Sequence, residues 1–331
     1  MPRHMPPKLQ NWLCAMQVEP TIHSFGLWHH FAHKPGFDCI TYADLAVELG
    51  FKGISLSLNN ANYRHLGGRE TWRMDRLRTH LQGLGFSLEV DTSGTDPTHM
   101  TELLGVAQRM GAGSLRTYTR HSGTPEEMMA ATIRDLAAVA PVARDLGIVI
   151  VLENHEDFTG PELAKIVEAV GHPSLQILYD YGNSQMVLED PEAALDAVLP
   201  HVYSVHFKDH VMVRPEDAGQ LMVAGVPVGD GVLPLRKLTK RLLDHGLRRI
   251  TFENVWAYTA PIRTSRVPLA GVTLGEGAFA FADPPFDPAH LVLDQSRLSP
   301  EQLVHLEHKA LLCGTAAFRR VLTDLGCVLP D

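Results

Sequence analysis

Short runs of apolar, β-forming residues recur along this chain at a nearly constant spacing, and segments with a helical pattern separate them. Most runs begin 26 to 34 residues after the previous one, which is the length of one strand–helix unit. Eight such units within about 250 residues predict an α/β fold, a closed (β/α)8 TIM barrel. An open doubly wound sheet is the alternative, but no glycine-rich phosphate-binding motif follows the first run. The runs are residues 21–27, 53–58, 87–90, 114–118, 148–152, 176–179, 202–207 and 250–252.

Helix boundary signals lie between the runs. The predicted helices 42–49, 97–110 and 125–146 each end just before a glycine, the residue that best adopts the left-handed conformation after a helix. Thr124 and Ser299 are each followed by Pro and then by acidic or amide residues, which is the pattern of a capping box. The signal at Ser299 predicts a last helix that runs to about residue 325.

Two segments interrupt this rhythm and predict long loops after the seventh and eighth strands. Residues 208–232 are rich in glycine, and residues 257–299 contain many Gly and Pro residues. Loops of this length usually serve as functional lids or oligomer contacts, and we expect a homodimer or homotetramer. Nothing resembles a linker, so we predict an N-terminal extension at 1–20 and one barrel domain at 21–331.

Composition excludes several classes of protein. Of the 331 residues 45% are hydrophobic, so the chain can bury a sizeable core and is not disordered. Its 29 Lys and Arg against 38 Asp and Glu give a net charge of −9, which argues against nucleic acid as a partner. Four cysteines without a C-x-x-C pair indicate a reducing compartment. No signal peptide or membrane-spanning run is present, and we expect a cytoplasmic protein without a membrane partner.

Polar residues stand at the ends of the last four runs. Glu153, Asp180, His206 and Glu253 each stand at the C-terminal end of a predicted strand, the edge on which barrel active sites are built. A single acid at such a position is usually a helix cap or an ion-pair partner, but converging carboxylates would repel one another without a cation. The donor set of three carboxylates and one imidazole predicts one divalent cation, Mn²⁺ first, with Mg²⁺, Co²⁺ or Zn²⁺ as alternatives.

The sequence around these residues resembles the xylose isomerase-like TIM-barrel superfamily of sugar (phosphate) isomerases and epimerases. The resemblance implies that the four residues ligate one cation, and that Glu153 and Glu253 are also the acid/base pair of a sugar isomerase or epimerase. Such an enzyme acts on a small ketose, sugar acid or sugar phosphate through a metal-bound enediolate. The matching segments are LENH at 152–155, YDYGN at 179–183, VHFKD at 205–209, FEN at 252–254 and the glycine turn at 229–231.

Five further residues are candidates for contact with a sugar-like substrate. His155 follows the first candidate ligand by two residues, and Asn183 follows the second by three. Lys208 and Arg116 are the cations expected to meet an anionic substrate group, with a pair between Arg116 and a metal-site carboxylate as the alternative. Trp256 is expected to form part of the cavity wall, with packing in the core as the alternative. Weaker candidates are Asp209, Glu89, Asp91, Asn59, Asn60, Phe25 and Trp28, and the histidines at 23, 29, 30 and 33 are expected at the lip of the pocket.

Three positions depart from the sugar 3-epimerase pattern. Asn183, Met212 and Thr159 stand where that pattern has His, Arg and Glu. A lyase, which is a dehydratase or decarboxylase of an oxo-sugar or oxo-sugar acid on the same enolate chemistry, is therefore the alternative. Glu253 as a second acid favours isomerisation. Two more hypotheses are a DNA-repair barrel, against which the acidic charge argues, and a catalytically silent barrel that only binds a ligand.

Overall fold

The computed structural model describes residues 16–215, 220–263, 269 and 271–329, and within them eight parallel strands close into the predicted barrel. Neighbours around the barrel follow the chain from β2 to β8, and β11 closes it by pairing with both β8 and β2. All eight strands coincide with predicted runs to within a few residues. They are β2 (Glu19–His23), β3 (Gly53–Ser57), β4 (Ser87–Asp91), β5 (Ser114–Thr117), β6 (Val149–Glu153), β7 (Leu175–Asp180), β8 (Val202–Phe207) and β11 (Arg249–Phe252).

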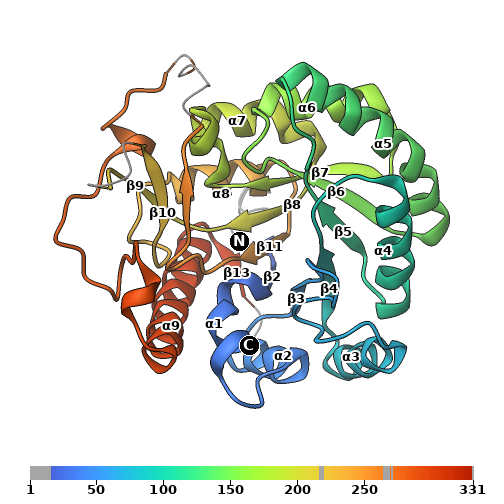
Figure 1. The fold of residues 1–331 in the computed structure, drawn as a ribbon, viewed down its shortest axis with the longest axis horizontal. Coiled ribbons are helices and arrows are strands. Elements are labelled where there is room, and N and C mark those ends of the chain that lie inside the picture. Colours follow the sequence, from blue (N-terminus) through green and yellow to red (C-terminus); the bar gives the residue numbers. More distant parts are fainter. Residues whose placement is uncertain (1–15, 216–219, 264–268, 270, 330–331) are drawn as a thin grey trace, which may run out of the picture.

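Helices surround this barrel as an outer ring (Figure 1). The predictions for α4 and α5 match the structure at both ends, and Gly111 and Gly147 take the left-handed conformation with φ of 79° and 70°. Helix α2 begins earlier than predicted because Asp38 accepts the amide protons of Ile40 and Thr41 and so caps it. The helices are α1 (Trp28–His33), α2 (Cys39–Glu48), α3 (Thr71–Leu84), α4 (Pro97–Met110), α5 (Pro125–Leu146), α6 (Gly160–Val170), α7 (Pro191–Val198), α8 (Leu235–Asp244) and α9 (Pro300–Asp324).

The two faces of the barrel strands differ in polarity. Because side chains alternate along a strand, Leu88 and Val90 join the hydrophobic core. Glu89 alternates with them and is fully buried, and it accepts a hydrogen bond of 2.7 Å from Ser114 on the neighbouring strand. The next residue of β4 on the same face is Asp91, at the C-terminal end of the strand. The strands therefore carry buried polar side chains toward the mouth of the barrel.

Both predicted long loops are present, and they combine into an element that the sequence did not predict. The segment after β8 forms β9 (His210–Val213) and β10 (Met222–Gly225), and the segment after β11 adds β12 (Thr259–Pro261). These three strands pair antiparallel in the order β12-β10-β9. In Figure 1, β9 and β10 lie on one side of the barrel, at the left of the view. The small sheet ties the two loops together beside the barrel mouth.

The start of the chain departs from prediction in two ways. Strand β2 begins at Glu19, inside the predicted extension, and the rest of the first run turns into a 3-10 helix at Ser24–Leu27. Residues Met16–Gln17 form β1, which pairs in parallel with β13 at Cys327–Val328 near the other end of the chain. The rest of the predicted extension, including Cys14, lies outside the described residues. Among the residues described, no helix combines the length and apolarity needed to cross a bilayer.

Candidate functional site

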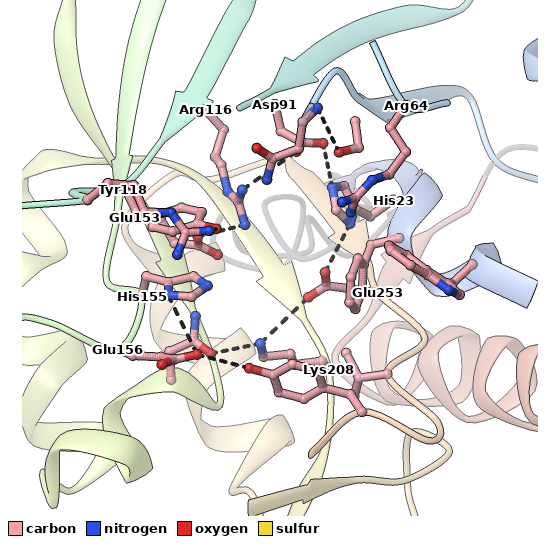
Figure 2. A pocket seen from close by; sticks show the side chains of 18 residues that line it. His23, Arg64, Asp91, Arg116, Tyr118, Glu153, His155, Glu156, Lys208 and Glu253 are labelled. Atoms are coloured by element: carbon pink, nitrogen blue, oxygen red, sulfur yellow. Dashed lines mark hydrogen bonds and ion pairs between the residues drawn. The ribbon is translucent and has the colours of Figure 1, made fainter. Parts of the chain in front are cut away.

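A polar cavity of 320 Å³ opens at the C-terminal ends of the barrel strands (Figure 2). Its walls come from the segments that follow most of the strands, so residues far apart in the sequence meet there. Of the predicted site residues, six line it: Glu153, Glu253, His155, Asn183, Lys208 and Arg116. Other lining residues are His23, Phe25, Trp28, Ser57, Asn59, Arg64, Asp91, Tyr118, Arg120, Glu156, Val255 and Tyr258.

The four candidate metal ligands converge on one point. Donor atoms of Glu153, Asp180 and His206 all lie within 4.8 Å of one another, and these three residues could hold a metal ion. Nδ1 of His206 lies 3.3 Å from Glu153 Oε1 and 3.7 Å from Asp180 Oδ2. Glu253 Oε2 also lies 3.7 Å from the same nitrogen. The structure thus brings all four side chains together around the imidazole of His206.

The electrostatics of this group fit a cation. His206 is fully buried, and neither of its ring nitrogens makes a hydrogen bond within the described residues. Burial alone would lower the pKa of His206, but Glu253, Asp180 and Glu153 raise it to about 10. A positive charge is therefore strongly favoured at the point where the carboxylates meet, and a divalent ion supplies one with ligand bonds to each group.

His23 connects Glu253 to a fourth buried acid, Asp91. Its Nε2 lies 2.9 Å from Asp91 Oδ2, and its Nδ1 lies 2.9 Å from Glu253 Oε1. Burial acts to lower the pKa of His23, but Asp91 and Glu253 raise it above its usual value. His23 therefore holds one oxygen of Glu253 in place while the other faces His206. From the sequence we expected His23 in a histidine cluster at the pocket lip and missed its contact with Glu253. Its position at the end of the first strand could have indicated that it belongs to the site.

Arg116 holds Glu153 in a similar way. Its guanidinium lies 2.7 Å from Glu153 Oε2 and 3.6 Å from Asp91, and it donates a hydrogen bond of 3.2 Å to the carbonyl of Thr92. Burial acts to raise the pKa of Glu153, but Arg116 reverses that effect and holds the pKa well below its usual range. Arg116 was expected to meet an anionic substrate group, but in the structure its guanidinium is paired with the Glu153 carboxylate of the site itself.

Lys208 occupies the opposite side of the group. Its Nζ lies 2.8 Å from Asp180 Oδ2 and donates a hydrogen bond of 2.8 Å to Asn183 Oδ1. The same ammonium lies 3.7 Å from Glu253. The other oxygen of Asp180 accepts amide protons from Gly182 and Asn183, so backbone and side chains both fix this carboxylate.

His155 stands in the wall above Glu153. Its ring stacks on Tyr118 with a centroid separation of 3.7 Å and an angle of 4° between the planes. Burial lowers the pKa of His155 to about 4, so the imidazole is neutral and can both donate and accept a hydrogen bond. Glu156 lies beside it and accepts a hydrogen bond of 3.2 Å from the Tyr258 hydroxyl.

Several expected contacts have other partners in the structure. Trp256, expected in the cavity wall, does not line this cavity; its indole N–H donates to the Pro288 carbonyl, because the chain turns away after Val255. Asp209 accepts amide protons from Gly229, Gly231 and Leu233, and so fastens the glycine turn.

The remaining histidines of the cluster are held by an acid from the far end of the chain. Glu307 on α9 is buried and accepts the amide protons of His29 and His30 at 2.8 and 2.9 Å. It also lies 2.6 Å from His30 Nδ1. This carboxylate therefore caps the first turn of α1 and joins α1 to α9. Sequence reasoning missed Glu307 because it lies 278 residues after His29.

Two of the residues that depart from the epimerase pattern, Thr159 and Met212, stabilise the fold outside the cavity lining. Thr159 is the N-cap of α6, where a capping box with Glu162 forms. Met212 is fully buried in the small cluster around the three-stranded sheet. Of the weaker candidates, Asn59, Phe25 and Trp28 line the cavity, whereas Asn60 does not and Glu89 lies deeper, with Ser55 and Ser114.

Two curated proteins match part of the chain. The uncharacterized protein YihM of Escherichia coli is 27% identical over 203 residues, which are 61% of this chain and 62% of that protein. The 3-oxo-isoapionate decarboxylase of Pectobacterium atrosepticum is 28% identical over 163 residues, 48% of this chain and 58% of that enzyme. The matched region thus spans less than two thirds of either relative.

A solved structure and a family model identify the fold. The structure of D-psicose 3-epimerase with D-tagatose from Clostridium cellulolyticum H10 has a TM-score of 0.61 and 14% sequence identity, and the match covers 94% of this chain and 100% of that one. The family model of the xylose isomerase-like TIM barrel matches residues 43–266. Because that match spans more than half of the sequence and the barrel is closed as the family requires, the chain belongs to the xylose isomerase-like TIM barrel family.

Proposed function

We propose that this protein is a divalent-metal-dependent isomerase or epimerase of a small ketose, sugar acid or sugar phosphate. The observation that carries the proposal is the convergence of three buried carboxylates on His206 at the floor of a polar cavity. Titratable side chains whose pKa values are strongly shifted and that meet at a cavity are typical of functional sites. The similar structure of D-psicose 3-epimerase supports the same conclusion.

Glu153, Asp180, His206 and Glu253 would hold the cation, and their mostly oxygen donors favour Mn²⁺. When bound, a divalent ion polarises a carbonyl group and lowers the pKa of the neighbouring C–H bond. Asp180 serves only as a ligand, because both of its oxygens have further partners in Lys208 and the backbone.

Proton transfer falls to the two glutamates. Glu253 Oε1 lies 2.9 Å from His23 Nδ1, and this contact helps to keep the carboxylate ionised, which is the form that can take a proton from a substrate carbon. Glu153 comes from β6 and Glu253 from β11, three strands apart around the barrel, which suits delivery to opposite faces of one carbon. His155 and Lys208 stand in the wall, where they can donate hydrogen bonds to substrate oxygens.

One observation favours a lyase as the second candidate. Arg116 lies 2.7 Å from Glu153 Oε2 and holds that carboxylate ionised, which weakens it as a proton carrier. Burial acts to raise the pKa of Glu253, but Lys208, His206 and His23 hold it well below its usual range, so this carboxylate is ionised as well. Loss of carbon dioxide from an oxo-sugar acid needs one proton carrier rather than two. The relative from Pectobacterium atrosepticum is a decarboxylase, which agrees with this alternative.

Solvent deuterium exchange tests the proposal. We would incubate the Mn²⁺-loaded protein in D₂O with a panel of ketoses, oxo-sugar acids and sugar phosphates, and follow the carbon next to the carbonyl by NMR. We expect exchange with at least one member. It should disappear in Glu153→Gln and in Glu253→Gln and persist in Glu89→Gln, which alters a buried acid deeper in the barrel.

The same spectra separate the two candidates. An epimerised or isomerised product supports the first, whereas a shortened or dehydrated product supports the lyase. Exchange at the wild-type rate in either glutamate variant would remove that residue from proton transfer. A cytoplasmic location and a homodimer or homotetramer stay predictions, which cell fractionation and sedimentation would test.

A further inference from the structure

Two arginines reach the cavity without an acidic partner. Arg64 and Arg120 both line it, and within the described part of the chain neither guanidinium forms an ion pair with a carboxylate. Arg64 is half-buried, whereas Arg120 is exposed at the rim. Arginine is an efficient ligand for planar or tetrahedral anions because its N–H groups form a fixed fork.

Aromatic rings hold both guanidinium groups in place. The guanidinium carbon of Arg64 lies 4.4 Å from the centre of the Trp28 ring, and that of Arg120 lies 4.5 Å from the centre of the Tyr118 ring. Arg120 also donates a hydrogen bond to the Tyr118 hydroxyl. Stacking leaves the edge of a guanidinium free to donate hydrogen bonds. Both groups are thus oriented before any ligand arrives.

The other charges of the cavity are already compensated. Glu153 is paired with Arg116, and Glu253 with His23. Lys208, which we expected from the sequence to meet an anionic substrate group, lies 2.8 Å from Asp180. Glu156 accepts a hydrogen bond from Tyr258 and lies 3.7 Å from Arg263, and Asp91 is paired with His23. Among the described residues of the cavity lining, Arg64 and Arg120 are therefore the arginines that none of these acids engages.

These two arginines follow strands that lie across the barrel mouth from the strands of Asp180 and Glu253. Arg64 follows β3, which lies opposite β7 in the closed barrel, and β7 ends at Asp180. Arg120 follows β5, which lies opposite β11, and Glu253 follows β11 directly. A substrate that bridges the cavity would present one end to each side.

We propose that Arg64 and Arg120 bind an anionic terminus of the substrate, a phosphate or carboxylate group, on the side of the cavity across from Asp180 and Glu253. The inference rests on the proposed function, because it assumes that the reacting end lies at the carboxylate group. It narrows the substrate class to a sugar phosphate or a sugar acid and excludes a neutral ketose.

Isothermal titration of the full chain with inorganic phosphate, acetate and glycerol tests this inference. We would measure EDTA-treated protein, so that no anion binds through a metal ion, and then Mn²⁺-loaded protein. The wild type should bind phosphate or acetate saturably at about one per chain, and glycerol should not bind. The anion with the lower Kd identifies the terminus. Arg64→Gln and Arg120→Gln should each raise that Kd about tenfold, as expected for one lost charged hydrogen bond.

Arg73→Gln is the matched control. Arg73 also stacks on a tryptophan, with 4.5 Å to the Trp72 ring, but it lies outside the cavity. This variant should bind as the wild type does. The inference would be overturned if the wild type bound neither anion at about 10 mM, a range that covers weak sites, or if Arg64→Gln with Arg120→Gln left the Kd unchanged.

Anion binding without metal is independent of proton transfer, so the two proposals can fail separately. Anion binding that depends on the two arginines, together with no deuterium exchange from any substrate, would support the anion site and contradict the proposed isomerase activity. Deuterium exchange with a neutral ketose that neither arginine substitution changes would support the proposed isomerase activity and contradict the anion site.

Discussion

Replacement of Arg116 by methionine removes the charge that faces Glu153 but keeps a long, unbranched side chain. The two groups lie 2.7 Å apart, and their side chains are only 9% and 1% exposed. Glu153 and Asp91 hold the pKa of Arg116 above its usual value, so the guanidinium is charged in the folded protein at every accessible pH. In Arg116→Met the Glu153 carboxylate stays buried and loses its closest partner, while His206 remains 3.3 Å away.

The expected cost is large for a single substitution. Removing one member of a buried ion pair typically lowers the free energy of unfolding by about 3–5 kcal/mol. We expect this loss in EDTA. We expect a clearly smaller loss in saturating Mn²⁺, because the cation also compensates Glu153. Arg73→Met removes an exposed ion pair with Glu70 and should cost less than about 1 kcal/mol in both conditions.

Urea denaturation followed by circular dichroism measures these values. A double-mutant cycle with Glu153→Gln isolates the pair, since Arg116→Met should cost much less when residue 153 is already neutral. An equal cost in both backgrounds would show that Arg116 stabilises the fold through contacts other than Glu153. An equal cost with and without Mn²⁺ would show that Glu153 does not face a cation.

Three further outcomes follow from other parts of the fold. A Cβ on Gly182 would lie 2.5 Å from His210 Nδ1 and 3.2 Å from Lys208 Cε, so Gly182→Ala should lower the free energy of unfolding by about 1–3 kcal/mol. The control Gly105→Ala, in an exposed and open part of α4, should raise the free energy of unfolding by about 0.5–1 kcal/mol. A Gly182→Ala variant more stable than Gly105→Ala would be inconsistent with this packing. Glu307→Ala should cost about 3 kcal/mol or more in urea denaturation, since two amide groups and His30 lose their acceptor; a cost below about 1 kcal/mol would mean that water replaces it. Burial lowers the pKa of His65 to about 3, so between about pH 6.5 and pH 4 this histidine is protonated in the unfolded chain but not in the folded chain. The free energy of unfolding should therefore decrease as the pH is lowered through this range, by up to about 1.4 kcal/mol per pH unit. The fall measured by urea titration should be shallower in His65→Asn, and parallel curves would refute the assignment.

The barrel could be predicted because its evidence is local. Each strand is a short run whose β-forming residues are contiguous, and each turn glycine stands next to the helix that it ends. The same regularity placed Glu153, Asp180, His206 and Glu253 at strand ends. In a closed barrel, strand ends necessarily share one rim. The meeting of these four side chains thus followed from chain spacing alone.

The other features depend on contacts between distant segments. Strand β10 pairs with β12 across an intervening helix and barrel strand, and neither segment alternates in polarity enough to predict that pairing. Glu307 reaches His29 across most of the chain. Trp256 leaves the cavity because the chain turns after Val255, and Arg116 and Lys208 are engaged by Glu153 and Asp180. Spacing along the sequence indicates which residues share a rim, but the partner of each charge depends on the packing.

The central claim is that the buried carboxylates and His206 bind one divalent cation. Titration of metal-free protein with Mn²⁺, followed by calorimetry, tests it most directly. We predict one Mn²⁺ per chain, a Kd raised about 100-fold or more in Asp180→Asn, and an unchanged Kd in Glu89→Gln. Absence of stoichiometric binding by the wild type, or binding of equal strength by Asp180→Asn, would contradict the claim.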